Sequence, residues 1–372
     1  MKLYKKFSNL FDVNKIKQLS NNDILISSSN TLKIYSIDTF ENLYKLKEIN
    51  SSYISIIDIK EIDNSNKNEI LLAISLSNCS IQIIKLFFKN KNKANNTNIK
   101  KSYKHKLQQE INCKLKANLI NLCIESIKGI LITSINNKVL YYQNSQKEKI
   151  NFIKFEEYNL KNEISIKKIT SYQTKQDNFI ITIEENFHDI NNNIFDISIE
   201  IKIYFFENFE LITCIKDINI SPEKCLMSFM TYYSPDKAYL LIADTHEKLM
   251  MLKMHDDFDI YEEISLIKNI KELSSNKCNT KENYKIKTIC GLHDGTFVVC
   301  LYYNESLNEK NYLIRGKINL KTKKFELLEI NDNAHNNKTN FITNSSMIKR
   351  KQYNENFLIS GDHEGMLKIW KI

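Results

Sequence analysis

Glycine and proline are scarce in this chain, which has only 6 glycines and 2 prolines among its 372 residues. Average usage is nearer to ~7% and ~5%, so most turns must be built from other residues. Asparagine and aspartate tolerate the left-handed backbone conformation that glycine usually supplies. We therefore expect these two residues to replace glycine at turns.

Long apolar runs are also missing. The chain has no stretch of 18 apolar residues, so no membrane-spanning helix is expected. Residues 1–7 carry three lysines and lack the apolar stretch of a signal peptide. These absences predict a soluble intracellular protein, either cytoplasmic or nuclear.

The eight cysteines do not form a recognisable site. No two of them have C-x-x-C spacing, and the histidines near them form no ligand cluster. Several lie inside apolar segments (Cys123, Cys214, Cys290 and Cys300), where a free cysteine behaves as a small hydrophobic residue. We expect no metal site and a reducing compartment.

Catalytic motifs are absent as well. The sequence contains no G-x-S-x-G, G-x-G-x-x-G, P-loop or H-E-x-x-H pattern. We therefore predict that the protein is not an enzyme, and that it has no cofactor and no small-molecule substrate.

What the chain does have is a repeat. Residues 358–372 show an apolar segment, a polar turn and a second alternating segment that ends in the only tryptophan, Trp370. This pattern predicts a β-hairpin. Six further copies, some of them degenerate, are found at residues 25–35, 72–84, 130–142, 201–204, 241–247 and 296–318.

Additional strand patterns flank these hairpins. Residues 37–46 and 320–328 look like a turn followed by an outer strand, and residues 54–59 and 286–290 look like inner strands. Seven repeats of four strands would take about 53 residues each, more than the usual 40–45. The last copy has no outer strand of its own, and residues 2–7 alternate in a way that fits this role. We expect this N-terminal strand to join the last repeat and remove exposed sheet edges.

The repeat resembles the WD-repeat (WD40-like) family of β-propellers. The resemblance covers nearly the whole chain and is specific at residues 24–46 and 358–372. It implies an all-β fold: a seven-bladed β-propeller of four-stranded antiparallel blades, closed by the N-terminal strand, with residues 1–372 forming a single domain. The family pattern joins an acid, a hydroxyl, a histidine and the tryptophan by hydrogen bonds. It implies these roles for Glu364, Ser360, His335 and Trp370, with apolar packing holding the other blades.

One insertion carries most of the net charge of +9. Residues 89–106 contain seven lysines and no acid, and we place them between the third and fourth strands of the second blade. A basic patch for nucleic acid or an acidic partner is one interpretation, and a solvated low-complexity loop is the other. The candidate contacts are Lys89, Lys91, Lys93, Lys100, Lys101, Lys104 and Lys106, together with a predicted hairpin tip at Lys349, Arg350 and Lys351. Residues 185–195, 268–285, 303–311 and 331–340 are expected to be loops.

Two functions remain open from the sequence. The first is a non-catalytic scaffold that binds other proteins through the propeller faces, as a subunit of a larger intracellular assembly. The alternative is an accessory subunit of an RNA-processing or ribosome-assembly particle that contacts phosphates through the lysine-rich insertion. With only two arginines, Arg315 and Arg350, sequence-specific nucleic-acid recognition is not favoured. The fold alone does not select a partner.

Overall fold

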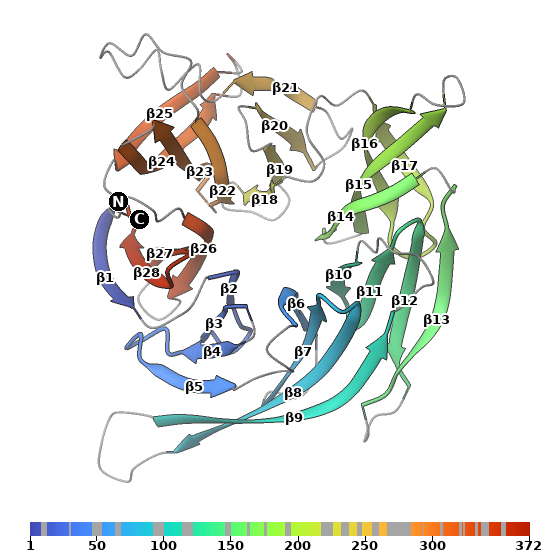
Figure 1. Cartoon of the computed structure of the whole chain (residues 1–372), viewed down its shortest axis with the longest axis horizontal. Helices are drawn as coiled ribbons and strands as arrows, with labels where there is room; N and C mark the ends of the chain where they lie inside the picture. Colours follow the sequence, from blue (N-terminus) through green and yellow to red (C-terminus); the bar gives the residue numbers. More distant parts are fainter. Residues whose placement is uncertain are drawn as a thin grey trace. The chain divides into compact units, whose positions relative to one another are not determined.

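The computed structural model is built from β-strands, 28 of them among the residues that it describes (Figure 1). Those residues are 1–8, 13–29, 31–46, 54–63, 68–91, 100–113, 122–145, 150–161, 164–174, 177–189, 195–216, 226–231, 238–243, 248–254, 260–265, 284–292, 294–305, 308–319, 322, 324–331, 334–335, 342–350 and 355–372. Within this part of the chain, no helix is long and apolar enough to cross a membrane. The chain divides into two compact units, residues 17–219 and residues 1–16 with 220–372.

Four antiparallel sheets of four strands lie in the first unit, each formed by consecutive strands. We call them blades 1 to 4, and their first strand begins two residues before the unit boundary. Blade 1 comprises β2(Lys15–Gln18), β3(Ile24–Ser27), β4(Leu32–Tyr35) and β5(Asn42–Leu46). Blade 2 comprises β6(Ile56–Ile62), β7(Glu69–Leu76), β8(Ser80–Lys91) and β9(Lys100–Asn112). Blade 3 comprises β10(Leu122–Ile127), β11(Ile130–Ile135), β12(Lys138–Asn144) and β13(Phe152–Asn159). Blade 4 comprises β14(Ile164–Gln173), β15(Asn178–Asp189), β16(Phe195–Phe205) and β17(Leu211–Ile215).

Three sheets of the same kind lie in the second unit, and we call them blades 5 to 7. Blade 5 comprises β18(Leu226–Thr231), β19(Ala238–Ala243), β20(Lys248–Lys253) and β21(Ile260–Ser265). Blade 6 comprises β22(Tyr284–Gly291), β23(Thr296–Glu305), β24(Asn308–Asn319) and β25(Lys324–Asn331). Blade 7 comprises β26(Ile342–Arg350), β27(Glu355–Asp362), β28(Met366–Lys371) and the N-terminal strand β1(Lys2–Ser8). The described strands therefore confirm the predicted seven four-stranded sheets.

The N-terminal strand completes blade 7, as the sequence predicted. β1 pairs antiparallel with β28, so that Lys2 lies opposite Lys371 and Phe7 opposite Leu367. The Met1 ammonium group also forms an ion pair with Glu329 on β25. Pairing of the two chain ends covers the edge of β28, which would otherwise be open to other strands.

Apolar side chains fill the spaces between neighbouring sheets of each unit. One cluster joins blades 1 and 2 through residues such as Leu25, Ile34, Leu72 and Ile84. Comparable clusters join blades 2 and 3, 3 and 4, 5 and 6, and 6 and 7. The second and third strands supply much of this core, because both faces of these central strands are covered.

Asparagine occupies only some of the turn positions that have a left-handed backbone conformation. Of the six described non-glycine residues with positive φ, two are the expected asparagines, Asn22 and Asn136. Phe40 and Phe209 occupy equivalent turns of blades 1 and 4, where each amide donates to the carbonyl four residues earlier. Both phenylalanine rings are buried, so apolar contact compensates for the unfavourable backbone conformation.

The described parts of two predicted loops belong to strands. Residues 185–189 pair with residues 195–199, and residues 303–305 pair with residues 308–310. Residues 185–189 and 303–305 are mostly polar and lack the apolar alternation that marks a half-buried strand, whereas their partner residues 195–199 do alternate. Within 331–340, Ala334 and His335 are buried. Most of 268–285 lies outside the described residues.

Candidate interaction surfaces

A buried network of hydrogen bonds links three parts of blade 7. The Trp370 indole donates to Ser360 Oγ at 2.9 Å, and Ser360 Oγ lies 2.9 Å from His335 Nε2. The other imidazole nitrogen, Nδ1, lies 2.8 Å from Asp362 Oδ2. Each of these four residues is at most 2% exposed. The arrangement places Ser360 and Trp370 in the structural roles that the resemblance implies.

The acid of this network is Asp362, which corrects the assignment to Glu364. Side chains two residues apart on a strand share a face, so Asp362 projects on the same face as Ser360. Glu364 belongs to the turn after the strand, and its amide donates to Asp362 Oδ1 at 3.1 Å. The Met366 amide donates to the same oxygen at 2.8 Å. The sequence did contain this signal, in the period-two spacing of Ser360 and Asp362.

The environment sets the charge of the two titratable members. Burial lowers the pKa of His335 below its usual value, although Asp362 opposes this shift. Burial alone would raise the pKa of Asp362, but hydrogen bonds from His335 and from the Met366 and Glu364 amides hold it below its usual range. At neutral pH the pair is therefore a neutral imidazole that donates to a carboxylate, the arrangement expected of a structural network.

Blade 4 contains a counterpart that the sequence analysis missed. Glu184 is fully buried and accepts hydrogen bonds from Thr182 Oγ1 at 2.7 Å and from Tyr204 Oη at 2.8 Å. Lys202 Nζ forms an ion pair with the same carboxylate at 2.6 Å and with Glu200 at 3.1 Å. Thr182 lies opposite Lys202, as Ser360 lies opposite Lys368. The acid follows two residues after the hydroxyl in both blades, and the aromatic residue follows two residues after the lysine.

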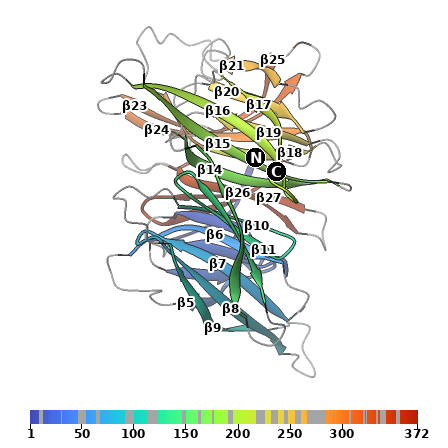
Figure 2. The ribbon, with the colours of Figure 1, turned by 90° about the vertical axis from the view of Figure 1, so that its right-hand side faces the viewer.

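The described residues of the lysine-rich insertion, 89–91 and 100–106, form a β-ribbon, which differs from the interpretation as a solvated loop. β8 and β9 pair from Ser80 with Asn112 to Lys91 with Lys100, and they run side by side as a long hairpin (Figures 1 and 2). Lys89, Lys91, Lys100, Lys101, Lys104 and Lys106 therefore lie on strands. Lys93 lies outside the described residues. Lys104 and Lys106 are exposed.

One face of this ribbon is attached to blade 1. Tyr103 is buried against it, and its hydroxyl donates to Asp23 and accepts from Asn21 Nδ2. Tyr44 on β5 hydrogen-bonds His105 Nδ1 and packs at an angle against Tyr103. Aromatic contacts and the hydrogen bonds of a buried hydroxyl therefore attach the ribbon to blade 1.

The second predicted basic group has a different location. Lys349 and Arg350 are the last residues of β26 and lie opposite Asn356 and Glu355. They are therefore strand residues rather than the expected hairpin tip, and Lys351 lies outside the described residues.

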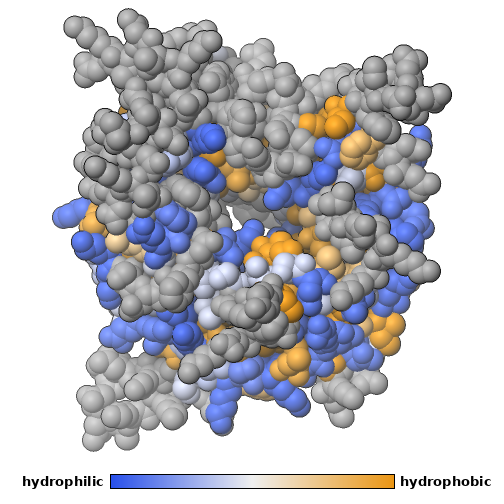
Figure 3. Space-filling model, viewed as in Figure 1, coloured by the Kyte–Doolittle hydropathy of each residue, from blue (hydrophilic) through white to orange (hydrophobic). Residues whose placement is uncertain are grey.

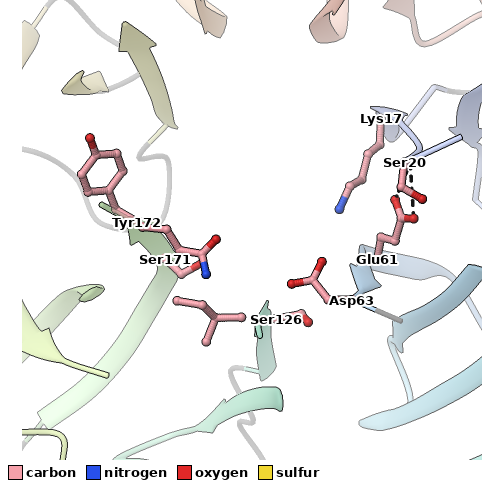
Figure 4. A pocket seen from close by; sticks show the side chains of 9 residues that line it. Lys17, Ser20, Glu61, Asp63, Ser126, Ser171 and Tyr172 are labelled. Atoms are coloured by element: carbon pink, nitrogen blue, oxygen red, sulfur yellow. Dashed lines mark hydrogen bonds between the residues drawn. The ribbon is translucent and has the colours of Figure 1, made fainter. Parts of the chain in front are cut away.

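A polar pocket of about 320 Å³ is formed by the first strands of blades 1 to 4 (Figure 4). Lys17, Glu61 and Asp63 approach it from one side, and Ser171 and Tyr172 from the other. Both carboxylate oxygens of Glu61 accept the Ser20 amide, at 3.0 and 3.3 Å. Burial, with the positive charge of Lys60, lowers the pKa of Lys17. Among the described residues, no three His, Cys, Asp or Glu side chains are grouped to hold a metal ion.

Comparison with solved structures identifies the fold. The structure is similar to the crystal structure of Raptor from Chaetomium thermophilum, with a TM-score of 0.65 and 12% identity over 100% of this chain and 29% of that chain. It is also similar to the WD40 domain of SCAP from fission yeast, with a TM-score of 0.52 and 10% identity over 96% of this chain and 84% of that chain. No protein-family model and no curated protein matches the sequence. At 10–12% identity these similarities establish the fold alone. The chain has the fold of a WD40-type, seven-bladed β-propeller.

Proposed function

We propose that this protein is a non-catalytic scaffold, one body of seven blades that serves as a subunit of a larger intracellular assembly. WD40-type propellers are typically protein-interaction scaffolds, and the fold supports that general role here. The six described cysteines are free thiols, which suits a reducing compartment. The buried networks of blades 4 and 7 are enclosed within the sheets, so their polar groups support structure and are not open to a substrate.

The observation that carries this proposal is where the exposed apolar side chains lie. Ten large hydrophobic side chains are exposed among the described residues, and eight of them are on the fourth strand of a blade. These eight are Leu3 and Tyr4 on β1, Leu107 on β9, Ile153 and Phe155 on β13, Leu211 on β17, and Leu328 and Ile330 on β25. On the face shown in Figure 3, hydrophobic residues form small separate groups among hydrophilic ones. Edge strands are the part of a sheet that can pair with another chain, and apolar side chains on them would be buried in such a contact.

The native size of the protein in a cell extract tests this proposal. We expect the tagged full-length chain to migrate well above its own 43.9 kDa and to carry stoichiometric partners identified by cross-linking and mass spectrometry. Ile153→Asp, Leu211→Asp and Leu328→Asp should each leave the fold intact because these side chains are about half exposed. At least one of them should release a partner. A chain that migrates as a monomer without partners would overturn the scaffold proposal.

A second candidate is an accessory subunit of an RNA-processing or ribosome-assembly particle. The lysines of the β8–β9 ribbon favour it, because each phosphate neutralised by a lysine contributes to affinity. Deletion of residues 89–106 would be a poor test, since it removes the buried Tyr103. Lys104→Glu with Lys106→Glu is a better one. If two phosphate contacts are lost, the salt dependence of single-stranded RNA binding should fall by roughly 1.4 in log–log slope, and an unchanged slope would exclude these lysines.

A further inference from the structure

Two cysteines of blade 2, Cys79 and Cys113, lie opposite one another where β8 begins and β9 ends. The β8–β9 ladder starts with Ser80 opposite Asn112. One residue further out, the Cys113 amide donates to the Cys79 carbonyl at 2.9 Å, so the pairing continues to the two cysteines. Opposed residues joined in this way have Cα atoms about 5.5 Å apart. That separation is within the range of about 4.4–6.8 Å found for disulfide-bonded cysteines.

The two thiol groups are also near each other. Cys113 follows Ile111 by two residues, and both side chains are buried in the apolar cluster that joins blades 2 and 3. Burial raises the pKa of Cys113 to about 12, and the nearby Cys79 thiol adds to the shift, because two negative charges would repel. Both residues are free thiols, and Cys79 is the more exposed of the two.

The backbone conformation of Cys79 is unusual for a cysteine. Its φ of 61° lies in the left-handed region that glycine and asparagine favour, in the turn between β7 and β8. The rings of Phe40 and Phe209 compensate for the same conformation by full burial, but Cys79 is partly exposed and gains less from apolar contact. Backbone strain of this kind is concentrated at functional positions.

Direct opposition distinguishes this pair from the other described cysteines. Cys290 and Cys300 are on the neighbouring strands β22 and β23 and belong to one apolar cluster, but they are offset by two positions along the ladder. Among the six cysteines that the structure describes, no other two are opposed on adjacent strands. Cys290 and Cys300 therefore provide a matched control within the same protein.

We propose that Cys79 and Cys113 are an oxidation site at which hydrogen peroxide forms a reversible disulfide. The Cys79 thiolate attacks one peroxide oxygen, the O–O bond breaks, and the sulfur becomes a sulfenic acid while the other oxygen leaves as hydroxide and takes up the thiol proton as water. The Cys113 sulfur then attacks the sulfenic sulfur. The S–S bond forms, the S–O bond breaks, and the hydroxide leaves as a second water with the Cys113 proton. Two thiols are oxidised by two electrons and one peroxide is reduced to two waters.

The surroundings of the two thiols assign their order of reaction. Cys113 is buried and its raised pKa keeps it protonated, so it does not attack peroxide from solution. It can react only with a sulfenic sulfur held beside it. The bond would tie the turn before β8 to the end of β9 and so join the two strands of the ribbon at their base. A dithiol would reverse it by exchange, as suits a redox-sensing bond in a reducing compartment.

Peroxide treatment of the purified full-length protein tests the proposal. After brief exposure to an equimolar amount of hydrogen peroxide, the remaining thiols are alkylated and tryptic peptides are mapped without reduction by mass spectrometry. Trypsin separates the two cysteines, because Lys85 and Lys106 lie between them in the sequence. We expect one pair of peptides joined through Cys79 and Cys113, and its loss after treatment with dithiothreitol. Cys290 and Cys300 should remain alkylated. A disulfide between any other two cysteines, or unchanged thiols throughout, would overturn the proposal.

Substitution of each cysteine provides the second arm. In Cys113→Ala the sulfenic acid at Cys79 should persist and be trapped by dimedone about tenfold more than in the unsubstituted protein, since no neighbouring thiol removes it. Cys79→Ser changes a partly exposed side chain and should leave Cys113 reduced. Cys290→Ala is the control and should not alter the cross-link. Equal dimedone labelling with and without Cys113 would overturn the pairing, and oxidation of Cys113 in Cys79→Ser would overturn the order of the two steps.

Discussion

Blades 7 and 4 each contain a buried polar network at equivalent strand positions, but the two networks are formed by different residues. In both, a hydroxyl on the second strand lies opposite a lysine on the third, an acid follows the hydroxyl by two residues, and an aromatic residue follows the lysine by two. Blade 7 inserts His335 between Ser360 and the shorter Asp362, and Lys368 donates instead to the Ala334 carbonyl at 2.6 Å. The described network of blade 4 includes no histidine, and the longer Glu184 reaches Thr182, Tyr204 and Lys202 directly.

The difference determines what each network holds in place. His335 and Lys368 fasten the segment before β26 to the body of blade 7, so this network connects an irregular segment to the sheet. The blade 4 network lies entirely within β15 and β16. Loss of the acid should therefore release more structure in blade 7 than in blade 4.

Alanine substitution of the two acids should produce the largest effects, and in this order. Asp362→Ala leaves His335 and two amides without an acceptor and should lower the free energy of unfolding by about 3–5 kcal/mol. Glu184→Ala should cost about 2–3 kcal/mol, because Lys202 retains its ion pair with Glu200. Chemical denaturation of both variants checks the order. A larger loss for Glu184→Ala would contradict the comparison.

The two networks should respond to opposite ends of the pH scale. The folded-state pKa values of His335 and Asp362 are lowered, so their contribution is present above the unfolded values and is lost as the pH falls below ~6.5 and then below ~4. For Lys202, burial opposes the charge but Glu184 and Glu200 raise its pKa. Its contribution is present below ~10.5 and is lost as the pH rises further.

Variants of the two titrating groups separate these effects. His335→Gln should flatten the dependence of unfolding free energy on pH between ~5 and ~6.5 without changing the alkaline limb. Lys202→Met should flatten the alkaline limb alone. Thermal denaturation across both ranges measures this, and one variant that altered both limbs would show that the networks are not independent.

Substitution of Tyr103, where the ribbon contacts blade 1, should lower the free energy of unfolding by an intermediate amount. Tyr103→Phe removes the hydrogen bonds to Asp23 and Asn21 but keeps the ring, and it should cost about 1–2 kcal/mol. Hydrogen exchange of β9 amides should increase at the same time. Unchanged exchange in β9 would mean that the tyrosine hydroxyl does not hold the ribbon.

The smallest effect should come from Glu364→Ala. Glu364 contributes to the network through its backbone amide, which donates to Asp362. Substitution by alanine keeps this amide, so the free energy of unfolding should change by no more than about 0.5 kcal/mol. This variant is the matched control for Asp362→Ala. A loss comparable to that of Asp362→Ala would restore Glu364 as the acid of the network.

The sequence predicted the architecture because hairpin patterns repeat even where individual residues diverge. The pairing of β1 with β28 could be predicted from the alternation of residues 2–7. The blade 4 network could not, since no tryptophan marks the strands that carry it and only the fold brings Lys202 and Tyr204 to Glu184. The interpretation of residues 89–106 as a solvated loop rested on their low-complexity composition. Aromatic contacts instead attach Tyr103 of this segment to blade 1.

An engineered cross-link between the two chain ends tests the account most directly. Cysteines at Lys2 and Lys371, which are opposite one another on β1 and β28, should form a disulfide under mild oxidation, because directly paired strand residues lie within bonding reach. Cysteines at Lys6 and Lys371 are out of register and should not. Efficient cross-linking of the first pair alone, mapped by mass spectrometry, is the predicted result. Failure of that pair, or equal reaction of both, would contradict a last blade built from both ends of the chain.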